Sequence, residues 1–257
     1  MSDERSIAHV EDGIGWLTFS NRQRHNALTE RMAAEAAAIL DDFSRNPRVR
    51  LCVMKGAGEG AFVSGADIGG LSGRKVAPGG ARSSLGALFG ALSGFRKPLV
   101  AAIRGWCLGG GVAVAMKADI RIASSDSRFG IPAARLGVGY PLDSTRDLVN
   151  LVGPSAAKVI LFTAQRLSAD RALDLGLVDE VVGPDVLQDR VAEIAEAISR
   201  NAPLTIRAAK ASIDHIARGN PSEQDVIDCI MACLESRDFE EGRAAFLEKR
   251  EPLFRGE

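Results

Sequence analysis

Three successive glycines, at positions 109–111, stand between a strand-like segment and a short helix-like one. Residues 98–104 have the apolar run of a buried strand, the helix ends near Lys117, and residues 119–124 return as another strand. A strand, a glycine-rich turn, a helix and a further strand in this order indicate a parallel sheet covered by helices. The chain is therefore predicted to be an α/β protein.

The segment before this run fits the same class. A hairpin is expected from residues 7–10 and 14–19, because apolar and polar residues alternate on both sides of an Asp-Gly turn. Thr29 is a candidate cap for a helix that ends at Pro47, and residues 49–55 read as a buried strand. A polar, glycine-rich stretch then follows, and such a stretch can cover a site.

The pattern becomes helical toward the end of the chain. Helices are expected at 154–163, 168–174, 186–200, 203–217, 222–235 and 238–249, with a short strand at 177–182 between them. No internal repeat of fixed period is visible. We therefore predict an α/β core over residues 1–200 and a helical region over residues 201–257.

Composition excludes several classes of function. The formal net charge of the 257 residues is -1, so the chain has no general basic field for nucleic acid or an anionic membrane. The charged start of the chain lacks the apolar core of a signal peptide, and the longest apolar run is short for a membrane span. The three histidines and four cysteines form none of the short paired spacings of a metal site. We expect a cytoplasmic protein that binds no metal, nucleic acid or membrane.

The glycine run also has a chemical meaning. Glycines that open a helix leave unpaired N–H groups at its positive end, and no Cβ blocks the approach of a ligand. A developing oxyanion placed there would be stabilised by fixed donors. Close packing of the helix on a strand can also demand glycine, and this alternative stays open.

A second glycine motif follows the strand at 49–55. Residues 56–61 fit the GxGxxA dinucleotide fingerprint, but residues 62–65 are a poor start for the helix that it requires. No acidic residue ends a second strand about 20 positions later, as the fingerprint demands. A plain turn at the end of the strand is the preferred interpretation.

Several short segments occur in one order along the chain. They are Asn26-Ala27-Leu28, Ser64-Gly65-Ala66-Asp67-Ile68, Lys97-Pro98, Gly105 to Gly111, Ala118-Asp119-Ile120-Arg121-Ile122-Ala123, Phe129-Gly130-Ile131-Pro132, Leu136-Gly137 and the run from Ala172 to Val182. Taken jointly, they resemble the crotonase superfamily, also called the enoyl-CoA hydratase/isomerase family, from about Ile14 to Phe254. The resemblance implies a crotonase/ClpP-like spiral of ββα turns with a C-terminal helical region.

The family pattern also implies a site. The N–H groups of Ala66 and Gly110 would form an oxyanion hole for the carbonyl of an acyl-CoA thioester. The CoA would lie along two segments, which supply Arg24, His25, Ala27, Ala66, Asp67 and Ile68. Because coenzyme A is part of the substrate, no separate cofactor is expected. The helical region over residues 201–257 would assemble the chain as a homotrimer or a dimer of trimers.

Two positions depart from the hydratase pattern. Hydratases of the family carry two glutamates that position and activate water, and this chain has Ala113 and Ala133 in their places. A methyl group cannot accept a proton, and the loss of a general base costs about two to four orders of magnitude in rate. Hydration by two carboxylates is therefore not expected.

Two polar residues downstream are candidates to replace the two glutamates. Tyr140 can donate a proton or a hydrogen bond, and Asp143 can act as a base or nucleophile. Each also has a structural interpretation, since Tyr140 precedes a proline and can pack its ring, and Asp143 can cap a helix. Arg135 and Arg146 can hold a substrate carboxylate or lie at the surface.

The Leu-Gly-Val-x-Tyr element at 136–140 is similar to the methylmalonyl-CoA decarboxylase branch of the superfamily, although that branch has histidine where this chain has Ala66. Three functions remain open. The chain is an acyl-CoA lyase, decarboxylase or isomerase that stabilises an enolate, an enoyl-CoA hydratase with a relocated base, or a non-catalytic acyl-CoA-binding protein. We predict the first.

Overall fold

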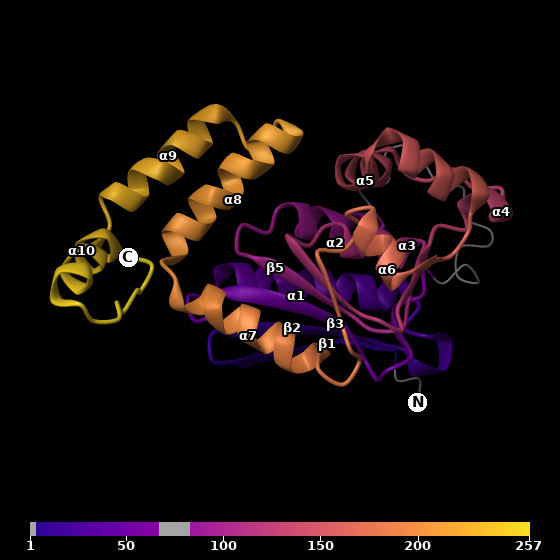
Figure 1. Cartoon of the computed structure of the whole chain (residues 1–257), viewed down its shortest axis with the longest axis horizontal. Helices are drawn as coiled ribbons and strands as arrows, with labels where there is room; N and C mark the ends of the chain where they lie inside the picture. Colours follow the sequence, from indigo (N-terminus) through magenta and orange to yellow (C-terminus); the bar gives the residue numbers. More distant parts are fainter. Residues whose placement is uncertain (1–3, 67–82) are drawn as a thin grey trace.

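The computed structural model describes residues 4–66 and 83–257, and these residues form a larger and a smaller sheet with helices around both (Figure 1). The larger sheet has the order β1-β2-β3-β5-β7-β10, made of Arg5–Glu11, Ile14–Ser20, Leu51–Gly56, Leu99–Ile103, Ile120–Ser124 and Glu180–Val182. The smaller sheet has the order β4-β6-β8-β9, made of Ala61–Val63, Trp106–Leu108, Arg128–Gly130 and Leu167–Ser168. From β2 to β10 the larger sheet is parallel, which confirms the predicted α/β class.

Helices follow most of the strands. They are α1 (Glu30–Arg45), α2 (Ser84–Ser93), α3 (Gly110–Ala115), α4 (Ala133–Leu136), α5 (Leu142–Thr163), α6 (Ala169–Asp174), α7 (Leu187–Arg200), α8 (Pro203–Arg218), α9 (Glu223–Leu234) and α10 (Arg237–Glu248), with the 3₁₀ turn η1 at Arg22–Arg24. No helix in the described ranges is long and apolar enough to cross a membrane.

The predicted hairpin and first helix are confirmed. β1 and β2 pair antiparallel around Asp12 and Gly13, whose φ angles of 49° and 82° suit a two-residue hairpin turn. The side chain of Thr29 accepts a hydrogen bond from the N–H of Met32 at 3.2 Å, so it caps α1 as expected.

The larger sheet has two covered faces. On one face, Leu17, Phe19 and Met54 are buried in a core shared with α1, α3 and the smaller sheet. On the other face, Val53 packs in a second core with Val191 of α7. Because side chains alternate along a strand, neighbouring residues of β2 and β3 belong to opposite faces. We call these the α1 face and the α7 face.

The helix predicted at 154–163 is confirmed as the second part of α5. The span Leu142–Thr163 is interrupted at Gly153, whose φ of 75° and ψ of 165° are not helical. Pro154 then opens the second part, where proline is well tolerated. The first part, from Leu142 to the kink, was not predicted as a helix of its own.

Helices α8 to α10 stand away from the sheets, at the left of Figure 1. Their start and end points agree closely with the predicted ranges. They bury few residues and leave large apolar side chains exposed: Ile213, Ile216, Ile227, Ile230, Met231, Leu234, Phe239, Phe246 and Leu247. The division into residues 1–200 and 201–257 stays a prediction.

Candidate functional site

The glycine run lies where β6 passes into α3. Gly109 has φ 51° and donates its N–H to the carbonyl oxygen of Gly130 at 2.8 Å. No residue of the described ranges accepts a hydrogen bond from the N–H of Gly110, the first residue of α3. This amide is therefore an unpaired donor at a helix N-terminus.

Close packing explains the third glycine. A Cβ built on Gly111 would lie 1.9 Å from the carbonyl oxygen of Val63, a distance that no side chain can tolerate. At Gly110 the same construction lies 3.3 Å from the amide nitrogen of Ala66 and 3.6 Å from the carbonyl carbon of Gly65. Close packing therefore accounts for Gly111, and the chemical interpretation of Gly110 stays a prediction.

Ala66 follows β4 and lies against this turn. It forms an isolated parallel bridge with Leu28, whose N–H donates to the carbonyl oxygen of Gly65 at 2.8 Å. Within the described ranges, the N–H of Ala66 also has no acceptor. Two unpaired amides from different strand ends thus lie near each other, and their joint role as an oxyanion hole stays a prediction.

The segment of Arg24, His25 and Ala27 lies beside the segment that leads to Ala66. The hydroxyl of Ser64 donates to the carbonyl oxygen of Arg24 at 3.1 Å. The N–H of Ser64 donates to the carbonyl oxygen of His25, also at 3.1 Å. The structure therefore brings these two predicted segments together. Asp67 and Ile68 lie outside the described residues.

Asn26 holds this arrangement in place, a role that the sequence did not reveal. Its side-chain oxygen accepts from the N–H of Asn21 at 2.9 Å, and its amide nitrogen donates to the carbonyl oxygens of Ala57 and Ala61 at 3.0 and 2.7 Å. It is buried and has φ 57°, a conformation that asparagine adopts more readily than most residues. In the sequence, the only sign of this role is that position 26 is an asparagine, a residue able to hold such a turn.

Tyr140 lies beside the N-terminus of α3. Its hydroxyl donates to the carbonyl oxygen of Gly109 at 3.3 Å, one residue before the Gly110 amide. Its ring packs on the core of the α1 face. Burial, with a smaller contribution from Cys107 and Asp147, raises the pKa of the Tyr140 phenol above its ordinary value. The phenol is therefore a neutral donor at physiological pH.

Asp143 is placed differently. It lies in the first turn of α5 with its side chain 79% exposed, and it pairs with Arg146 at 2.8 Å. The predicted capping role is wrong, because Pro141 is the N-cap of α5. Arg135 is also exposed. The ion pair between Asp143 and Arg146 is a surface contact.

The two alanines at the hydratase positions are buried. Ala113 lies in α3 with 3% of its surface exposed, and Ala133 opens α4 with 9% exposed. A buried carboxylate does lie elsewhere nearby, on α5. Asp147 pairs with Lys117, directly after α3, at 2.8 Å, and Arg218 of α8 approaches its other oxygen at 3.8 Å. This cluster joins α3, α5 and α8.

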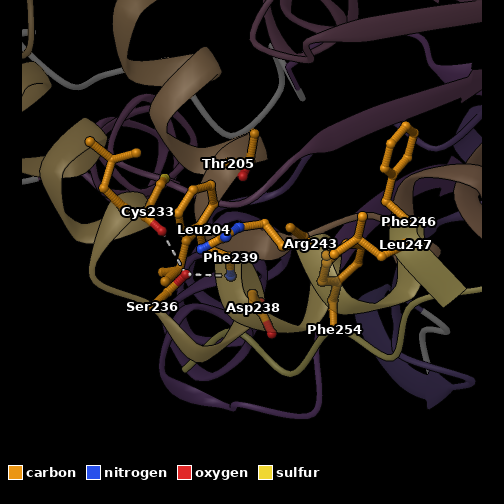
Figure 2. Close-up of a pocket in the computed structure, with 13 residues that line it drawn as sticks. Leu204, Thr205, Cys233, Ser236, Asp238, Phe239, Arg243, Phe246, Leu247 and Phe254 are labelled. Carbon is orange, nitrogen blue, oxygen red and sulfur yellow. Dashed lines mark hydrogen bonds between the residues drawn. The ribbon is translucent and has the colours of Figure 1, made fainter.

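A cavity of about 670 Å³ lies elsewhere, between the start of α8, the end of α9, α10 and the C-terminal segment (Figure 2). Its lining is mostly apolar and includes Leu204, Phe239, Phe246 and Phe254. It contains none of the predicted site residues, so it belongs to the helical tail and not to the chemistry around Gly110. In the described ranges, no group of three His, Cys, Asp or Glu side chains is arranged to hold a metal ion.

Comparison with known proteins finds matches along nearly the whole chain. The family model described as enoyl-CoA hydratase/isomerase matches residues 9–257. A short-chain-enoyl-CoA hydratase of Clostridium acetobutylicum is 35% identical over 95% of each chain, and a crotonyl-CoA hydratase of Syntrophomonas wolfei is 34% identical over 99% of each chain. The crystal structure of an enoyl-CoA hydratase/carnithine racemase from Magnetospirillum magneticum has a TM-score of 0.92 at 30% identity, covering 98% of this chain and 96% of that one.

Proposed function

This chain belongs to the enoyl-CoA hydratase/isomerase family, with the crotonase fold, and on that premise we propose that it is an enzyme that stabilises the enolate of an acyl-CoA thioester. The observation that carries the proposal is the proximity of two unpaired amides, since a Cβ built on Gly110 would lie 3.3 Å from the nitrogen of Ala66. Each N–H donates to the thioester oxygen as negative charge develops on it. Removing one such donor from other oxyanion holes costs about 3 to 4 kcal/mol of transition-state stabilisation.

The reaction is a lyase, decarboxylase or isomerase reaction. In a decarboxylation, the bond between the α-carbon and a carboxylate carbon breaks, and its electron pair forms the enolate while CO₂ leaves. No base is needed for this step, which suits a site with Ala113 and Ala133 at the hydratase positions. A proton must then reach the α-carbon to complete the product.

Tyr140 is the proposed donor near that carbon. Its hydroxyl donates to the carbonyl oxygen of Gly109, in the peptide group that carries the Gly110 N–H, and it keeps its proton because burial disfavours the phenolate. In this role it exchanges its hydrogen bond with Gly109 for one with the substrate, and it donates a proton or orients the water that does so.

The CoA part of the substrate lies along two adjacent segments in this proposal. Arg24, His25 and Ala27 come from the first, and Ala66, Asp67 and Ile68 come from the second. The hydrogen bonds of Ser64 to the first segment support a common binding surface. Coenzyme A is then part of the substrate and not a separate cofactor.

An enoyl-CoA hydratase with a relocated base is the second candidate. The named hydratases that are 35% and 34% identical to this chain favour it. It requires a carboxylate that activates water, and Asp143 is the residue proposed for that role. The exposure of Asp143 and its ion pair with Arg146 favour the first candidate instead.

The tail helices provide the surface for assembly. Apolar side chains such as Ile216 and Phe246, each 84% exposed, have no cover in the single chain. A concentration of exposed large apolar side chains on three neighbouring helices is typical of a protein interface. A homotrimer or a dimer of trimers formed through residues 201–257 would bury it.

Turnover assays separate the candidates. The full-length protein is incubated with crotonyl-CoA and, separately, with a malonyl-type thioester, and both thioesters are followed by mass spectrometry. Consumption of the malonyl-type thioester without hydration of crotonyl-CoA is expected. Water addition to crotonyl-CoA would establish the hydratase, and CoA binding without turnover of any acyl-CoA would establish a binding protein.

A further inference from the structure

A second pocket, of about 540 Å³, shares no residue with the site around Gly110. It lies where β2 and β3 end. Its polar lining comes from five elements, β1, β2, η1, β3 and α7, and consists of Arg5, Thr18, Ser20, Arg22, Lys55 and Gln188. The pocket is also lined by Gly56, Ala57 and Gly58. These residues belong to the segment that the sequence pattern matched to a dinucleotide fingerprint.

The pocket opens on the α7 face of the larger sheet. Thr18 alternates with Leu17 and Phe19 along β2, and these two neighbours are buried on the α1 face. Met54 is buried on the α1 face, so its neighbour Lys55 lies on the α7 face. Gln188 lies in the first turn of α7. The sheet therefore separates this pocket from the two unpaired amides.

The lining has cationic but no anionic side chains. Arg5, Arg22 and Lys55 contribute three positive groups, and no Asp or Glu of the described residues lines the pocket. A chain with a formal net charge of -1 thus gathers cations in one place. Like charges repel one another, so such a group is stabilised when an anion enters.

Two of these cations have no carboxylate partner within the described ranges. The ammonium of Lys55 lies 4.7 Å above the ring centroid of Trp16, and no ion pair involves it. The guanidinium of Arg22 lies along Gly58, where a built Cβ would be 3.4 Å from the Arg22 Nε. Gly58 has φ 73°, a conformation that favours glycine. Because glycine has no Cβ, the Arg22 side chain can lie against it.

We propose that this pocket binds a phosphoryl group, with Arg22 and Lys55 as its main partners. A guanidinium matches two phosphate oxygens at once, and an ammonium supplies a point charge to a third. The hydroxyls of Thr18 and Ser20 add neutral donors beside them. The phosphoryl group belongs to a phosphorylated metabolite other than the acyl-CoA substrate, because the sheet separates this pocket from the two unpaired amides.

Calorimetric titration of the full-length protein with inorganic pyrophosphate tests this inference. One saturable site is expected at constant ionic strength. Lys55→Met and Arg22→Met should each weaken the binding at least tenfold. The matched controls are Lys158→Met on α5 and Arg48→Met in the turn before β3, both exposed, and they should bind as the unmodified protein does.

Repetition with saturating coenzyme A identifies the source of the phosphoryl group. Unchanged pyrophosphate binding is expected for a separate metabolite, and displacement by coenzyme A would overturn the proposal, since the pocket would then belong to the substrate site. The proposal is overturned if pyrophosphate does not saturate a site, or if both pocket variants bind it as tightly as the two controls. Because pyrophosphate binding needs no turnover, this result is independent of the reaction at Gly110.

Discussion

Tyr140 gives a residue-scale test with an unusually clean signal, because it is the one tyrosine of the chain. Burial disfavours the phenolate and raises the pKa, so the phenol keeps its proton above pH 10, its ordinary value. We predict that the phenolate absorbance at 295 nm appears only above pH 10 in the folded protein and near pH 10 in guanidinium. A midpoint near 10 in both states would contradict the buried position.

The same residue should matter for turnover. Tyr140→Phe keeps the ring in the core but removes the hydroxyl, so kcat is expected to fall by about 10²-fold or more while KM for the acyl-CoA stays within about threefold. Loss of the hydrogen bond to Gly109 alone costs only about 1 kcal/mol of stability. An unchanged kcat would reduce Tyr140 to a packing residue.

Asp143 separates the two candidate reactions. If enolate stabilisation needs no base, Asp143→Asn should change kcat by less than about threefold, since the side chain is 79% exposed and paired at the surface. If Asp143 is the relocated base of a hydratase, the same change should lower kcat by about 10²- to 10⁴-fold. Steady-state kinetics with both thioester substrates distinguishes these results.

The proposed backbone donors leave more signal in the sequence than the side chains do. The amides of Ala66 and Gly110 depend on glycine-rich turns after strands, and such turns leave a local signal in the sequence. The surface ion pair of Asp143 and the buried pair of Asp147 and Lys117 depend on how α3 and α5 pack, which no local pattern records.

At the scale of elements, the buried pair of Asp147 and Lys117 ties α5 to the end of α3. Asp147→Asn leaves the Lys117 ammonium buried without its counter-charge, and such a change typically costs about 3 to 5 kcal/mol. We predict a loss of this size in the free energy of unfolding, measured with urea. Asp143→Asn, on the same helix but exposed, is the matched control and should cost less than about 1 kcal/mol. Equal losses in the two variants would show that the buried pair contributes nothing specific.

The long elements were predictable and the short ones were not. α7 to α10 carry helical spacing over 12 to 16 residues, and the structure reproduces them closely. β4, β6 and β8 have three residues each, too few for an alternation to be recognised. Their pairing joins segments that are far apart in the sequence, which no local pattern records. The smaller sheet was therefore not predicted, although the glycine-rich turn after β6 was.

At the scale of the whole molecule, we expect the exposed apolar side chains of α8 to α10 to be covered by other copies of the chain. We predict that sedimentation velocity gives about three times, or six times, the 27.2 kDa mass of one chain. Phe246→Ser should weaken the assembly, because this side chain is 84% exposed on α10. Phe162→Ser on α5, where the phenylalanine is 75% exposed, is the control and should leave the mass unchanged. A monomer in the unmodified protein would contradict the predicted homotrimer.

The central claim is that backbone amides, and not carboxylates, carry the chemistry, and Gly110 allows a direct measurement. Proline fits the first position of a helix but has no N–H, so Gly110→Pro deletes one donor while α3 can still form. Gly110→Ala adds a Cβ at the same place, 3.3 Å from the Ala66 nitrogen, and keeps the N–H.

Comparison of these two variants isolates the donor. With both variants folded by circular dichroism, the account predicts that kcat of Gly110→Pro is lower than that of Gly110→Ala by about 10²- to 10³-fold, with similar affinity for CoA. Equal kcat values in the two variants would contradict it.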